Sequence, residues 1–168
     1  MVRKLMFLAI LCSFVLFGGL ASADGMYQEL PFGGSFFGHW VVTSFDGTVV
    51  ASNNGTPFFY DVNTGVFTYC DAAGFNGPQN ISGDGLMMIG TAPNADAFNQ
   101  AATWSLGNGL QFVPLVPGAA PCDASLSSGY DLCFDGSQAV GLAWLGCDAE
   151  AFKWSSPDAE AVALGTSG

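Results

Sequence analysis

Short apolar runs alternate with clusters of Gly, Asn, Asp, Ser and Pro from residue 40 to the end of the chain. Three Asp-Gly pairs divide this pattern, at Asp46-Gly47, Asp84-Gly85 and Asp135-Gly136. Each pair lies between two apolar runs, which is a strong hairpin signal, and we expect type I′ turns in which both central residues have positive φ. After residue 23, no stretch keeps a 3.6-residue apolar period for three turns without Gly or Pro. The pattern therefore predicts short strands joined by tight turns and no helix in that part of the chain.

The same sequence of features recurs around each Asp-Gly pair. Strand-like runs precede the pairs at 40–44, 80–82 and 130–133, and apolar runs follow at 49–51, 87–89 and 139–140. A small residue stands next at a matching offset, at Ser52, Gly90 and Gly141. Further along each unit comes an aromatic residue, at Tyr60, Trp104 and Trp154. A second turn and a last apolar run complete the unit, so each unit is predicted to hold about four strands.

The spacing of the Asp-Gly pairs, 38 and 51 residues, brackets the length of a four-stranded propeller blade. One such blade buries too little apolar surface to stand alone, so neighbouring blades must stack. We therefore predict an all-β domain of about three four-stranded antiparallel repeats, stacked as blades of a partial or open β-propeller. The repeats are expected at about 30–70, 71–117 and 118–165. The alternative is a meandering β-sandwich in which the Asp-Gly turns match by coincidence.

The repeat resembles that of the bacterial extracellular HAF-repeat family. The third unit carries the likeness best, with Phe134-Asp135-Gly136, then 151–154 (Ala-Phe-Lys-Trp), then Leu164-Gly165. The name-giving His is absent from all three units, where Thr56, Gln100 and Glu150 stand instead. The resemblance implies a secreted, β-propeller-like array and supplies no catalytic residue to carry over.

Residues 1–23 have the three parts of a cleavable signal peptide. Arg3 and Lys4 form a positive start, residues 5–20 carry no charge, and small residues fill 21–23. We expect cleavage near Ala23/Asp24, which would leave a mature β-repeat domain of residues 24–168, secreted or at the cell surface. The apolar run is short for a membrane span, although an uncleaved anchor is the alternative. No second long apolar segment follows, so no membrane span is expected in the mature chain.

The charge balance narrows the range of partners. The chain carries a net charge of −11, and Lys153 is the one basic residue after residue 23, so residues 24–168 carry about −13. Nucleic acid is excluded as an expected partner, because its phosphates require Lys and Arg. Cationic partners and Ca²⁺ remain compatible with this charge.

Four cysteines follow residue 23, namely Cys70, Cys122, Cys133 and Cys147, and they allow three pairings into two disulfides. In a four-stranded blade, the start of the first strand and the end of the second strand share one rim. Cys122 and Cys147 occupy these two places in the third unit, whereas Cys133 stands beside the Asp-Gly turn at the opposite rim. We therefore favour Cys122–Cys147 over Cys133–Cys147.

The sequence contains no recognisable catalytic, cofactor or metal constellation. His39 is the single histidine and no cysteine pair has zinc-ligand spacing. Asp46, Asp84 and Asp135 are candidates for a ring of carboxylates that binds cations, but turn chemistry explains them as well. An aromatic cluster of Phe32, Phe36, Phe37 and Trp40 is compatible with a sugar-stacking surface or with packing of the first strand.

These features favour a non-enzymatic extracellular module that binds protein or glycan and needs no cofactor. The first alternative is a fragment of a propeller-type hydrolase or lyase whose active site requires further blades, and the second is a structural surface array. Because the chain stops where a fourth unit would begin, we expect either further blades or self-association.

Overall fold

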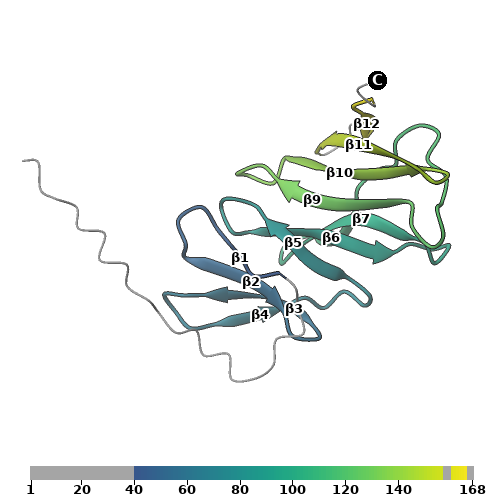
Figure 1. Ribbon diagram of the computed structural model, residues 1–168. Coiled ribbons are helices and arrows are strands. Elements are labelled where there is room, and N and C mark those ends of the chain that lie inside the picture. The colour runs from purple at the N-terminus through teal and green to yellow at the C-terminus, as the bar shows by residue number, and fades with distance from the viewer. Residues whose placement is uncertain (1–39, 157–159, 166–168) are drawn as a thin grey trace, which may run out of the picture. The chain divides into compact units, whose positions relative to one another are not determined.

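The computed structural model describes residues 40–156 and 160–165, which form twelve β-strands and no helix (Figure 1). The signal-peptide segment, His39 and the phenylalanines at 32, 36 and 37 lie outside the described residues. Blade 1 contains β1 (Val42–Thr43), β2 (Val49–Asn53), β3 (Pro57–Asp61) and β4 (Phe67–Tyr69). Blade 2 contains β5 (Asn76–Ile81), β6 (Met87–Pro93), β7 (Asn99–Ser105) and β8 (Gly109–Phe112). Blade 3 contains β9 (Ser127–Leu132), β10 (Gln138–Leu145), β11 (Asp148–Ser155) and β12 (Val162–Ala163).

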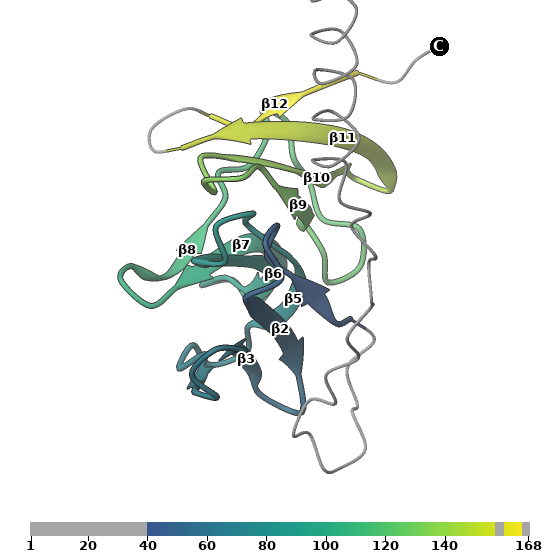
Figure 2. The same ribbon diagram turned by 90° about the vertical axis from the view of Figure 1, so that its left-hand side faces the viewer.

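Each blade is an antiparallel meander of four strands in sequence order, which confirms the predicted fold class. Blade 2 lies between blades 1 and 3 (Figures 1 and 2). The first strands of successive blades are neighbours, and the amide of Asn80 in β5 donates to the carboxylate of Asp131 in β9 at 2.6 Å. Every strand crosses its blade from one end to the other. We call the end with the Asp-Gly turns the turn end, and the end with the connections between blades the connection end.

The blades are held together by two apolar layers. Strands β6 and β7 send alternate side chains to opposite faces, so Met88 and Trp104 pack toward blade 1 while Ile89 and Ala101 pack toward blade 3. The rings of Phe59 and Trp104 are 5.8 Å apart across the first layer. A strand that is buried on both faces reads as a continuous apolar run, which is the pattern seen in the sequence.

The small residue after each Asp-Gly hairpin is required by a close approach between strands. A Cβ at Gly90 would lie 2.5 Å from the carbonyl oxygen of Asn76 in β5. At Gly141 it would lie 2.6 Å from the ring of Phe152. Both glycines face places where the first strand of the blade shifts register, as in a β-bulge. In blade 1 the position is Ser52, which is buried and donates its hydroxyl to the carbonyl of Trp40 at 3.0 Å.

The Asp-Gly pairs do form hairpin turns, but the expected type I′ geometry is wrong. Gly47, Gly85 and Gly136 have φ near +70°, whereas the aspartates that precede them do not: among the described residues other than glycine, positive φ occurs at Ala97 and Asp123. Compared with a two-residue type I′ hairpin, the loop contains one additional residue on either side of the Asp-Gly pair. Gly47 N–H donates to the carbonyl of Ser44, and Ser44 N–H donates to the carbonyl of Val49. Asp46 keeps negative φ because its carboxylate caps the turn instead.

The outer face of blade 3 is exposed. Val140, Ala151 and Lys153 are exposed there, while the matching residues of blade 2, Ile89, Ala101 and Thr103, are buried against blade 3. The described part of the chain supplies no fourth sheet to cover this face.

Candidate binding pocket at the first blade junction

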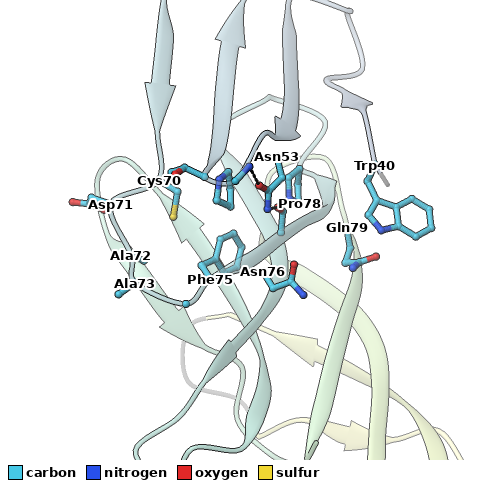
Figure 3. Close-up of a pocket in the computed structure, with 15 residues that line it drawn as sticks. Trp40, Asn53, Cys70, Asp71, Ala72, Ala73, Phe75, Asn76, Pro78 and Gln79 are labelled. Atoms are coloured by element: carbon cyan, nitrogen blue, oxygen red, sulfur yellow. Dashed lines mark hydrogen bonds between the residues drawn. The ribbon is translucent and has the colours of Figure 1, made fainter. Parts of the chain in front are cut away.

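A pocket of about 630 Å³ opens at the connection end between blades 1 and 2 (Figure 3). The β2–β3 hairpin of blade 1 supplies one wall, from Asn53 to Pro57. The connection from Cys70 to Phe75 and the first residues of β5 supply the remainder. Trp40 and Gln79 stand at one side in Figure 3, Asp71 and Ala72 at the other, and Phe75 and Asn76 between them.

Local hydrogen bonds shape the pocket wall. The carboxamide of Asn53 accepts from Gly55 N–H at 2.8 Å and donates to the carbonyl of Gly77 at 2.9 Å. Gly55 has φ +105°, a conformation that a residue with a Cβ rarely adopts. Gly77 is followed by a cis peptide bond to Pro78. Asn53 thus ties the hairpin of blade 1 to β5 of blade 2.

The connection at the other side of the pocket is anchored to the core. The indole N–H of Trp104 donates to the carboxylate of Asp71 at 3.1 Å. The neighbouring Cys70 is a free, buried cysteine, and burial raises the pKa of its thiol. A thiol that stays protonated is a poor nucleophile, so Cys70 has a packing role here.

The pocket presents groups suited to a neutral, hydroxylated ligand. Trp40 is 51 % exposed, so the face of its indole is available for stacking. The side chains of Thr56, Asn76 and Gln79 line the pocket and form no hydrogen bond within the described part of the chain. Carboxamides both donate and accept, as hydroxyl groups do. Asp71 is the one carboxylate among the described residues that line the pocket, whereas glycoside hydrolysis normally uses a pair.

The equivalent region between blades 2 and 3 is closed. Here the connection pairs with the start of β7: Asn99 N–H donates to the carbonyl of Ala124 at 2.7 Å, and Leu126 N–H donates to that of Asn99 at 2.8 Å. Ala120 pairs in the same way with Trp144 in β10. The Cys122–Cys147 disulfide, the pairing that the blade geometry favoured, fastens this connection to the β10–β11 hairpin.

The three aromatic residues that recur in the sequence repeat belong to the core of the blades and not to the pocket. Tyr60, Trp104 and Trp154 are all buried, at the matching position of the third strand of each blade. Within the described residues, the indole N–H of Trp154 has no hydrogen-bond partner.

The three Asp-Gly carboxylates act within their own turns. Asp46 accepts from the hydroxyl of Ser44 at 2.7 Å and from Thr48 N–H at 3.0 Å, and Asp84 has the same two kinds of donor. In blade 3, the thiol of Cys133 replaces the serine and lies 3.0 Å from Asp135. Asp61 similarly accepts from Asn63 and Thr64 N–H, which supports the turn interpretation.

No group of three metal-ligating side chains is found in the ranges that the structure describes. Those ranges also hold no helix of the length and hydropathy that crossing a membrane requires.

Sequence reasoning singled out one residue of the pocket, Trp40, as a candidate for ligand contact; it named Thr56 and Cys70 for other reasons and missed the remainder. Asn53, Asn76 and Gln79 lie in segments that read as ordinary turn and strand sequence. Their shared place depends on how two blades meet, which no local pattern encodes.

Comparison with known proteins shows the fold. The chain superimposes on TolB from Acinetobacter baumannii with a TM-score of 0.56 and 15% sequence identity, over 76% of this chain and 32% of that one. It superimposes on a TolB-type protein from Agrobacterium tumefaciens with a TM-score of 0.52 and 14% identity, over 76% of this chain and 48% of that one. The chain thus spans about a third of the first of these proteins and about half of the second. No family model and no curated protein matches the sequence.

The chain therefore has a β-propeller-like architecture, as the TolB proteins do.

Proposed function

We propose that the protein is an exported, non-enzymatic binding module whose pocket at the first blade junction takes a neutral glycan. The observation that carries this proposal is the exposed indole of Trp40 in a pocket lined by three polar side chains, which form no hydrogen bond with the residues that the structure describes. Sugars present an apolar face of C–H groups and a rim of hydroxyls, so they match a stacking ring flanked by carboxamides.

Two further features support export and binding. The Cys122–Cys147 disulfide fits an oxidising compartment, which is where the signal-peptide pattern would send the chain. Among the described residues that line the pocket, none is basic and able to hold a phosphate or a polyanionic sugar. A neutral oligosaccharide therefore suits the site better than a charged one.

The test is titration of the purified protein with a panel of neutral oligosaccharides, with the heat of binding measured by calorimetry. Trp40→Ala should weaken binding about tenfold, equivalent to ~1.4 kcal/mol. Tyr130→Ala removes an equally exposed aromatic ring from blade 3 and should leave the affinity unchanged. Absence of binding across the panel, or equal losses in both variants, would contradict the proposal.

A further inference from the structure

The turn end of the blades carries a group of exposed apolar side chains from all three blades. We call it the turn-end patch, and it comprises Phe45, Val66, Leu86, Leu106 and Phe134. Phe45 is 86 % exposed and Leu106 is 76 % exposed. Single exposed apolar residues are ordinary, but several from separate turns gathered on one end of a domain are typical of an interaction site.

The aromatic part of the patch is held in place by the backbone. Phe45 N–H donates to the carbonyl of Gly83, and Asp84 N–H donates to the carbonyl of Phe134, both at 2.9 Å. The rings of Phe45 and Phe134 meet edge to face, with centroids 6.1 Å apart. Gly83 permits this, because a Cβ there would collide with the Phe134 ring. The two rings therefore form one ordered surface that bridges three blades.

Two grooves adjoin each other at this end. The first, of about 340 Å³, is mostly apolar and lies between blades 1 and 2; its lining includes Val66, Leu86, Leu106, Phe59 and Asp61. The second, of about 330 Å³, lies toward blade 3; its lining includes Leu86, Leu106, Asn108, Asp84 and Asp135. Leu86 and Leu106 line both grooves and so form a ridge between them.

The charge around the ridge is negative. Asp61 lines one groove, and Asp84 and Asp135 line the other. The pKa of Asp61 is lowered by hydrogen bonds, and the bond from the backbone N–H of Thr64 contributes most. The bonds from Cys133 and Ser137 lower that of Asp135 to about 2. Within 40–156 and 160–165, no Lys or Arg lines either groove.

This chemistry selects among possible occupants. A second copy of the chain would bring about −13 charges and one lysine after residue 23, so like charges would oppose its docking here. Anionic lipid surfaces are opposed for the same reason. A segment that combines apolar side chains with Lys or Arg satisfies both the grooves and the carboxylates.

We propose that the turn-end patch docks a basic amphipathic segment of another protein. Its apolar side chains would lie in the grooves beside Leu86 and Leu106, and its cations would face Asp61, Asp84 and Asp135. This site lies at the opposite end of the strands from the pocket at the first blade junction. The two proposals are therefore independent, and one protein could hold a glycan and a protein partner together.

The test uses the purified protein and a labelled helical peptide of Leu and Lys, about 18 residues or five turns long, with one apolar face. Fluorescence anisotropy gives the affinity, and amide chemical shifts locate the site. We expect shifts at the turn end and at least a tenfold loss of affinity in the double variant Leu86→Ser, Leu106→Ser. Val162→Ser removes an exposed apolar residue of β12 and serves as the matched control.

Charge is tested separately. Asp61→Asn, Asp84→Asn and Asp135→Asn together should reduce affinity and its dependence on salt, whereas Asp96→Asn with Asp148→Asn at the connection end should not. Equal losses in test and control variants would mean diffuse attraction between opposite charges and would overturn the proposal. Binding of uncharged phosphatidylcholine vesicles to the same residues, without binding of the peptide, would assign the face to a membrane and also overturn it.

Discussion

The two junctions between blades are built from the same elements and differ in how the chain crosses from one blade to the next. At the first junction the connection runs directly from Cys70 to β5, and a pocket remains beside the β2–β3 hairpin. At the second junction a longer connection fills the same place, pairs with Asn99, and is fastened by a disulfide. In these three blades, connection length and backbone pairing therefore decide which junction keeps an open pocket.

Removing the disulfide should have the largest effect and should be confined to the second junction. The double variant Cys122→Ser, Cys147→Ser releases a loop closed over a sequence separation of 25 residues. We expect the free energy of unfolding to fall by about 3 kcal/mol. Denaturant titration measures this loss.

The same variant tests whether the junctions are independent. Ligand affinity at the first junction should stay unchanged at temperatures where the variant is folded, because the described residues that line the pocket do not include any of the connection at 120–126. A loss of both stability and ligand binding would show that the second junction supports the pocket.

The Asp-Gly turns of blades 2 and 3 can be compared directly, because blade 2 has Ser82 where blade 3 has Cys133. Ser82 is fully buried, accepts from Met87 N–H at 3.0 Å and donates to Asp84 at 2.6 Å. Ser82→Ala leaves the Met87 N–H without a partner and should cost about 2 kcal/mol in unfolding free energy.

The matched substitution in blade 3 is Cys133→Ser. It restores the serine of the other two turns, and Gln138 N–H, which now donates to the sulfur at 3.1 Å, would gain an oxygen acceptor. The variant should be at least as stable as the parent protein in thermal unfolding. Destabilisation comparable to that of Ser82→Ala would show that the thiol has a role that a hydroxyl cannot fill.

The two buried tryptophans, Trp104 and Trp154, differ in whether the indole N–H has a hydrogen-bond partner among the described residues. Trp104 donates to Asp71 in the first connection, whereas the Trp154 N–H has no partner among the described residues. Trp104→Phe should cost about 1 kcal/mol, and Trp154→Phe should change stability by less than about 0.5 kcal/mol, because it also removes an unsatisfied donor. Equal costs, measured by denaturant titration, would mean that ring volume outweighs the hydrogen bond.

The sequence predicted the features that recur in every blade. Short apolar runs between turn residues located the strands, the Asp-Gly pairs located the first hairpins, and blade geometry placed Cys122 near Cys147. The turn type was wrong because the carboxylates of Asp46, Asp84 and Asp135 bind backbone N–H groups of their own loops and so stabilise a longer turn with negative φ at the aspartate.

The pocket itself could not be predicted. It depends on the absence, at the first junction, of the pairing that Asn99 makes at the second, and this pairing joins residues far apart in sequence. Asn53 has no sequence feature that distinguishes it from any loop asparagine, although its carboxamide joins two blades. The aromatic repeat positions were found because a buried ring recurs in each blade, and the same periodicity gives no signal for a feature that occurs once.

The smallest expected effect is a dependence of stability on acidity that comes from the turn in blade 3. Cys133, Ser137 and the backbone of Ser137 donate to Asp135 and lower its pKa from 3.8 to about 2. Because the folded state favours the ionised carboxylate, this contribution is complete above pH 3.8 and is lost as the pH falls toward 2. The variant Asp135→Asn should therefore have an unfolding free energy that changes less with pH between 2 and 3.8. Above pH 3.8, its pH dependence should match that of the parent protein. A carboxyl chemical-shift titration of Asp135 with a midpoint near 3.8 would show instead that neither the thiol of Cys133 nor the hydroxyl of Ser137 holds the carboxylate, and that the blade 3 turn is maintained by its backbone hydrogen bonds.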